Sequence, residues 1–127
     1  MNSNNQTLQL NSIDDLISAL SEGERTSYND LFRSIQIPSI AFKEFCSWSD
    51  EVYTRNCIVN TEKFELILLC WEPGQITPIH DHGGEECWVS VIQGEFRETI
   101  YKVDSVGKLD TIDSMISTAG DITYMID

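Results

Sequence analysis

Hydrophobic and polar positions change their spacing near residue 50 of this chain. Before that point apolar residues recur every three or four positions in segments 12–20, 27–35 and 38–48. This spacing places apolar side chains on one face of a helix, so it predicts three short helices. Ser12 is a good N-cap for the first of them, and Gly23 is a typical residue to end it.

The third predicted helix opens at Pro38, which is well tolerated in the first turn because its missing N–H would have no partner there. Its apolar residues predict an inner face made of Ile40, Ala41, Phe45 and Trp48.

From residue 52 onward the apolar pattern has period two and many β-branched residues, which predicts strands. Glycine-containing turns such as Pro73-Gly74 and Gly94-Glu95 separate them. Short strands joined by tight turns are typical of an antiparallel sandwich or barrel. We therefore expect one mainly β domain over residues 1–127, with a helical front at 1–50 and barrel strands at 51–127. The six candidate strands are 52–59, 63–72, 87–94, 95–103, 109–117 and 121–126.

The chain is strongly acidic, with 21 Asp and Glu against eight Lys and Arg and a formal net charge of −13. Such a charge repels phosphate backbones, so nucleic acid and anionic membranes are not expected as partners. The N-terminal residues lack the basic and apolar regions of a secretory signal, so we expect a cytoplasmic protein. Cysteines lack CxxC spacing, and Cys46, Cys57 and Cys70 are expected to be small buried hydrophobes.

Only two histidines are present, His80 and His82, and they are two positions apart. In an extended segment such residues point to the same side, so the two imidazoles can form a clamp for a transition metal. Gly83 and Gly84 follow and allow a sharp turn of the backbone. The pair by itself is equally compatible with a structural role.

The wider spacing of this segment resembles the first signature of the cupin superfamily. The pattern is Gly, five residues, His-x-His, four residues, Cys, six residues, Gly, carried by Gly74, His80, His82, Cys87 and Gly94. Cysteine stands where most cupins have glutamate. That substitution, together with "YTRN" at 53–56, "LLCW" at 68–71 and "IHDH" at 79–82, resembles the cysteine dioxygenase type I family. The resemblance implies a cupin-type antiparallel β-barrel (jelly roll) behind the helices.

The resemblance also implies a role for five residues. His80 and His82 would bind a mononuclear non-haem Fe(II). Arg55 would hold the substrate carboxylate, and Tyr53, on the same side of its strand, would line the pocket. Cys87 would form a thioether link to a tyrosine that this chain does not contain.

The implied reaction is oxidation of L-cysteine, a small thiol amino acid, to cysteine sulfinate by O₂ in a protein expected to be monomeric. Two alternatives stay open: another small thiol such as 3-mercaptopropionate, which Arg55 disfavours, or a non-catalytic cupin that binds a metal or an anion. A different register would make Glu86 a carboxylate ligand, because His-x-His is also followed by three residues and Glu86.

The family has a third histidine on a later strand, and this sequence ends at Asp127 before that position. We therefore expect the 127-residue chain to have weak or no activity. The sequence is compatible with part of a longer protein or with a degenerate relative.

Overall fold

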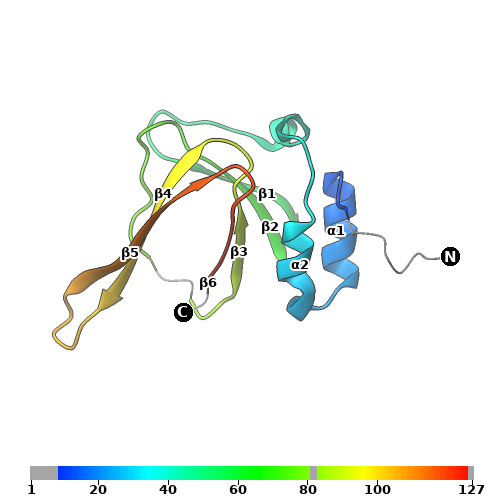
Figure 1. Ribbon diagram of the computed structural model, residues 1–127. Helices are drawn as coiled ribbons and strands as arrows, with labels where there is room; N and C mark the ends of the chain where they lie inside the picture. Colours follow the sequence, from blue (N-terminus) through cyan, green and yellow to red (C-terminus); the bar gives the residue numbers. More distant parts are fainter. Residues whose placement is uncertain (1–8, 81–82, 126–127) are drawn as a thin grey trace. The chain divides into compact units, whose positions relative to one another are not determined.

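The computed structural model describes residues 9–80 and 83–125, and its N-terminal part is helical (Figure 1). Three helical regions were predicted, and helical segments lie in all three. In Figure 1, α1 and α2 lie side by side. The segments are α1 (Ile13–Glu22), the short 3₁₀ helix η2 (Arg25–Ser27), α2 (Tyr28–Arg33) and the 3₁₀ helix η3 (Ser39–Phe45).

Both ends of α1 are set by the residues that the sequence indicated. The Ser12 hydroxyl accepts a hydrogen bond from the Asp15 N–H at 3.0 Å, which satisfies a backbone donor that the helix leaves unpaired. At the other end, the N–H of Gly23 donates to the Ala19 carbonyl at 2.8 Å. The helix buries its apolar stripe, namely Ile13, Leu16 and Leu20.

The second helix completes a small apolar core with α1. The Tyr28 hydroxyl donates to the Leu20 carbonyl at 2.7 Å, so its polar tip is satisfied inside the core. Leu10 forms a parallel bridge with Ile35, which ties the segment before α1 to the residues after α2. The buried apolar residues of this region are Leu10, Ile13, Leu16, Leu20, Tyr28, Leu31, Phe32, Ile37 and Phe42.

The predicted inner face of the third helix is wrong. Phe42 is its buried residue, whereas Ile40 is 68% exposed and Trp48 is 57% exposed. The segment is a 3₁₀ helix, with three residues per turn, so the face expected from 3.6-residue spacing does not form. Trp48 also lies beyond the end of η3.

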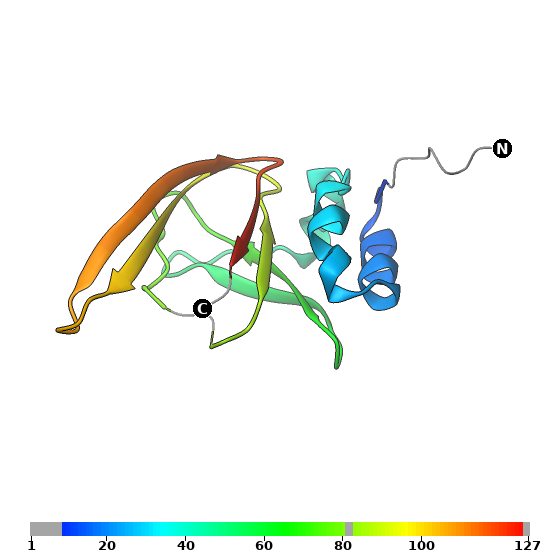
Figure 2. The same cartoon turned by 60° about the horizontal axis from the view of Figure 1, so that its bottom comes forward.

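All six predicted strands are present, and they form three two-stranded sheets with orders β1-β2, β3-β6 and β4-β5. The β1-β2 and β4-β5 pairs are antiparallel, and both hairpins are visible in Figure 2. In the described ranges these pairs do not join into a closed barrel. The strands are β1 (Thr54–Asn60), β2 (Glu65–Cys70), β3 (Cys87–Ser90), β4 (Glu95–Val103), β5 (Leu109–Thr118) and β6 (Ile122–Met125).

The chain divides into two compact units. One consists of Met1–Trp88 with Tyr124–Asp127, and the other of Val89–Thr123. The expectation of a single domain stays a prediction. Within the parts of the chain that the structure describes, no helix has the length and apolar character needed to cross a bilayer.

The second unit is built around the β4-β5 hairpin. Its turn is closed by Asp104, whose carboxylate accepts from the N–H groups of Val106 and Lys108 at 2.9 Å each. Apolar side chains of β5 are exposed, with Ile112 at 60% and Ile116 at 48%. The hairpin therefore carries apolar surface in addition to its polar positions.

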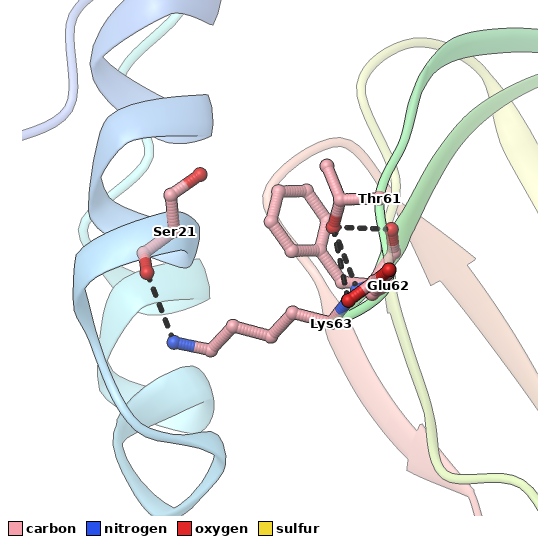
Figure 3. A pocket seen from close by; sticks show the side chains of 5 residues that line it. Ser21, Thr61, Glu62 and Lys63 are labelled. Atoms are coloured by element: carbon pink, nitrogen blue, oxygen red, sulfur yellow. Dashed lines mark hydrogen bonds between the residues drawn. The ribbon is translucent and has the colours of Figure 1, made fainter.

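A surface pocket lies between α1 and the turn that joins β1 to β2 (Figure 3). Lys63 crosses it and donates from Nζ to the carbonyls of Ser21, at 3.0 Å, and Gly23. A cation at the carboxyl end of a helix satisfies carbonyls that the helix leaves open. None of the predicted site residues lines this pocket, so Lys63 has a structural role here.

Candidate functional site

In strand β1, Arg55 lies on the face that points away from the segment following η3. Thr54 and Asn56 both contact Ser47, which follows η3: the Thr54 hydroxyl donates to the Ser47 carbonyl at 2.6 Å, and the Ser47 hydroxyl donates to Asn56 Oδ1 at 2.6 Å. Alternate residues of a strand point to opposite faces. Arg55, which is exposed and pairs with Leu69 of β2, therefore points away from Ser47.

Asn56 is a residue whose structural importance the sequence reasoning missed. Its Nδ2 donates to the Leu68 carbonyl at 3.1 Å and to the Thr54 hydroxyl at 3.0 Å, and lies 3.7 Å from Cys70 Sγ. The side chain thus joins β1, β2 and the segment after η3. Side chains of the segment 53–56 alternate between two faces. Tyr53 and Arg55 lie on one face, and Thr54 and Asn56, which anchor the strand, lie on the other.

We expect Asn56→Ala to lower the free energy of unfolding by about 2 kcal/mol, because it leaves partly buried polar groups without partners. Asn56→Asp should also destabilise, because a carboxylate cannot donate to the Leu68 carbonyl. Urea unfolding followed by circular dichroism measures both effects. Asn60→Ala, at the exposed end of the same strand, is the control. An Asn56→Ala chain as stable as this control would show that the network contributes nothing.

Tyr53 forms an aromatic pair with Trp71. Their ring centroids are 5.2 Å apart with an interplanar angle of 14°, a stacked arrangement. The register explains the pair: Thr54 lies opposite Cys70, so the residues just outside this pair meet across the two strands. Since Tyr53 and Arg55 share a face, the stack flanks the position from which the guanidinium projects.

The cysteines of this region differ in burial. Cys70 is buried and Cys46 is half-buried, whereas Cys57 is exposed, so the expectation that it is buried is wrong. Cys57 shares the exposed face of Arg55 on β1, which explains the difference. Burial raises the pKa of the Cys46 thiol, and its hydrogen bond with Cys70 and the charge of Cys70 add to the increase.

His80 lies in the loop before β3 and is exposed. Its Nδ1 lies 2.8 Å from the Pro78 carbonyl oxygen. A carbonyl only accepts, so Nδ1 is the donor in this contact, an arrangement common in metal-binding histidines. His82 lies outside the described residues. The described ranges contain no group of three His, Cys, Asp or Glu side chains able to hold a metal, so the two-histidine clamp stays a prediction.

Cys87 is the first residue of β3 and is half-buried. The backbone before it passes through Gly83 and Gly84, whose φ angles are 63° and 80°. These values lie in the left-handed region that favours glycine, so the predicted turn after the histidines is confirmed at these positions. The thioether link implied for Cys87 stays a prediction.

Glu86, the alternative metal ligand, is engaged by two other residues. Its Oε1 lies 2.9 Å from Nε of Arg25, and its Oε2 accepts a hydrogen bond from the Tyr124 hydroxyl at 2.6 Å. Both carboxylate oxygens of Glu86 are thus engaged in contacts within the protein. The choice between Cys87 and Glu86 at the family position stays a prediction.

Two tyrosines make the stability of the fold depend on pH in the alkaline range. The hydrogen bond to Glu86 is the main reason that the pKa of Tyr124 lies above its ordinary value, with desolvation and the charge of Glu86 adding to it and Arg25 opposing it. Burial raises the pKa of Tyr28. A folded pKa above the unfolded value of about 10 contributes stability that is complete below that pH and is lost as pH rises through the folded pKa.

We therefore expect the free energy of unfolding to fall as the pH rises above about 10. Tyr124→Phe should show a smaller fall, because the group that titrates is gone. Tyr28→Phe should also show a smaller fall. Both variants start from a lower value, since each loses the hydrogen bond of its hydroxyl at every pH. Urea unfolding at about pH 8 and about pH 11 tests this, and a fall in Tyr124→Phe as large as in the parent would contradict it.

A comparison with known protein families shows the class to which this chain belongs. The family model for cysteine dioxygenase type I matches residues 10–127. The chain belongs to the cysteine dioxygenase type I family.

Individual relatives match over shorter stretches. The chain is 33% identical over 73 residues to cysteine dioxygenase type 1 of Danio rerio, covering 57% of this chain and 36% of that protein. It is 40% identical over 50 residues to the proteins of the same name from Homo sapiens and Rattus norvegicus, covering 39% of this chain and 25% of each relative. The aligned regions thus span about a third of these relatives or less.

Proposed function

We propose that this protein is a thiol dioxygenase that oxidises L-cysteine to cysteine sulfinate with O₂, using a mononuclear Fe(II). The observation that carries the proposal is the family match over residues 10–127. The proposal includes a cupin-type barrel as the complete fold and a cytoplasmic location, where thiols stay reduced.

His80 and His82 are the residues that would hold the iron. Imidazole nitrogen is a suitable donor for Fe(II), and the contact of His80 Nδ1 with the Pro78 carbonyl is the kind of support that metal-binding histidines usually have. The described residues supply one such ring, so the donor type fits iron while the complete ligand set lies beyond them. When bound, the iron would activate O₂ and favour the thiolate form of the substrate.

Arg55 would orient the substrate by its carboxylate. Its guanidinium is exposed on β1, and the planar fork can make two parallel hydrogen bonds to a carboxylate. The stacked rings of Tyr53 and Trp71 beside it would restrict where the substrate lies. The amine is on the same carbon as the carboxylate and the thiol is on the next carbon, so anchoring at the carboxylate leaves both groups able to reach the metal together.

The proposed reaction balances without a further reductant. Sulfur loses the electrons that O₂ gains, both oxygen atoms form bonds to sulfur, and the thiol proton ends on the sulfinic acid. Protein residues therefore need only bind, orient and shield the substrate.

The test is O₂ uptake with L-cysteine by the Fe(II)-loaded chain, for which we expect weak or no turnover, and by a chain extended through a third histidine. The product is analysed by mass spectrometry under ¹⁸O₂. Cysteine sulfinate carrying both labelled oxygen atoms supports the proposal. Faster uptake with 3-mercaptopropionate than with cysteine would assign the other substrate. Cysteine binding without O₂ uptake, in this chain and in one extended through a third histidine, would leave a non-catalytic binding protein.

A further inference from the structure

Two neighbouring side chains anchor the start of β3 on one side. Glu86 is held by Arg25 of η2 and by Tyr124 of β6, as described above. Trp88, two residues later, donates from its indole Nε1 to Asn29 Oδ1 at 2.6 Å. Arg25 and Asn29 precede β3 by more than fifty residues, so the anchors join segments distant in sequence.

Aromatic packing reinforces the same side. The Trp88 ring meets the Tyr28 ring edge-on, with centroids 5.2 Å apart and an interplanar angle of 72°. Tyr124, which bonds Glu86, also packs on Trp88 with centroids 5.2 Å apart. One tyrosine therefore contacts both anchors, the carboxylate through its hydroxyl and the indole through its ring.

Cys87 lies between the two anchors. In an extended segment, residues i and i+2 share a side and the residue between them faces the other way. Because Glu86 and Trp88 both face Tyr124, the Cys87 thiol is directed to the opposite side. A shift of one residue would exchange the thiol for a carboxylate or an indole.

We propose that Glu86 is a positioning residue, which with Arg25 and Tyr124 fixes the side of β3 on which Cys87 is presented and the point at which the loop that carries His80 joins β3. The significance of that side for iron and substrate rests on the proposed function. The glycine pair at 83–84 has little intrinsic preference for one path, and Glu86 is the first side chain after it held at both oxygens.

Exposure decides which contact carries the effect. The side chain of Arg25 is 72% exposed and that of Glu86 is 20% exposed. Water screens the ion pair at its Arg25 end, so the pair alone contributes little. The short hydrogen bond from Tyr124 to the less exposed carboxylate gives the arrangement its direction. Loss of the Tyr124 hydroxyl should therefore matter more than Arg25→Lys.

The test measures the alkylation rate of each cysteine by peptide mass spectrometry in the full chain. Glu86→Ala should raise the Cys87 rate about tenfold, because local opening exposes a half-buried thiol, and leave the rate of exposed Cys57 unchanged. Tyr124→Phe, which keeps the ring on Trp88, should raise it by about half that factor. Glu85→Ala, at the exposed neighbour, is the matched control and should change neither rate.

The variant Ser12→Ala distinguishes a positioning role of Glu86 from a general contribution to stability. This variant removes the cap of α1 in the same compact unit without touching β3. If Cys87 alkylation rises in Ser12→Ala as much as in Glu86→Ala at equal loss of stability, or if Glu86→Ala behaves like Glu85→Ala, the positioning role is wrong.

Iron affinity gives the functional readout. Competition with a chelator should show Fe(II) binding weakened about tenfold or more by Glu86→Ala and unchanged by Glu85→Ala. Equal Fe(II) affinity in both variants would overturn the part of the proposal that concerns the loop of His80. If the alkylation results are as expected but neither the parent nor any variant oxidises cysteine, the positioning role of Glu86 stands and the proposed dioxygenase function is wrong.

Discussion

Arg55→Gln should weaken L-cysteine binding by about 10- to 100-fold, because it removes charge-assisted hydrogen bonds to the substrate carboxylate. Arg55→Lys should lie between the parent and the glutamine variant, since an ammonium keeps the charge but loses the planar fork. The measurement is a titration of the Fe(II)-loaded chain with cysteine under nitric oxide, followed by the iron-nitrosyl signal in electron paramagnetic resonance. This readout reports binding and does not require turnover.

Cysteamine, which lacks the carboxylate, is the matched ligand for this experiment. Its affinity should be the same for the parent and for Arg55→Gln. If both ligands lose affinity alike, Arg55 acts on the fold or on the iron and is not the carboxylate site. Arg97→Gln, at an exposed position of β4 in the other compact unit, controls for the change of net charge.

Replacement of either histidine should reduce Fe(II) affinity more than any other single change in this chain. We expect His80→Ala and His82→Ala each to weaken Fe(II) binding by about 100-fold or more, because each removes one of only two imidazole donors. Competition against a chromogenic chelator measures the affinity directly. Thermal unfolding of the metal-free variants shows whether they keep the fold.

The two replacements also distinguish a clamp from separate weak sites. If the two histidines share one iron, the first replacement already removes most of the Fe(II) affinity. The loss of binding free energy in the double variant should then be smaller than the sum of the losses in the two single variants. Retention of parental affinity in the double variant would place the iron elsewhere and remove the basis of the dioxygenase proposal. Glu85→Gln serves as control, since it changes an exposed acidic neighbour of the segment.

The local pattern was sufficient for the ends of α1 and for the existence of all six strands. The Ser12 cap, the Gly23 end and the turn at Gly83 and Gly84 rest on hydrogen bonds or dihedral preferences within a few residues. Such features can be read from consecutive letters. The same reading failed at η3, where Phe42 and not Ile40 is buried, because the segment is a 3₁₀ helix and 3.6-residue spacing does not describe it.

The candidate site divides in the same way. The period-two rule placed Tyr53 and Arg55 on one face of a strand, and the contacts of Thr54 and Asn56 with Ser47 agree with it. The rule could not show which face the helical front would cover. Exposure of Cys57 follows from that choice, and for this reason its burial was predicted wrongly.

By itself the sequence determined the order of helices and strands, the family, and the residues proposed to bind iron and substrate. Those properties depend on residue type and short spacing, which the chain carries in any conformation. Only the tertiary structure decided that Glu86 pairs with Arg25 and accepts a hydrogen bond from Tyr124. These partners are distant in sequence, so the contacts depend on how helices and strands pack. The direction of Cys87 follows from that packing together with the alternation of side chains along an extended segment.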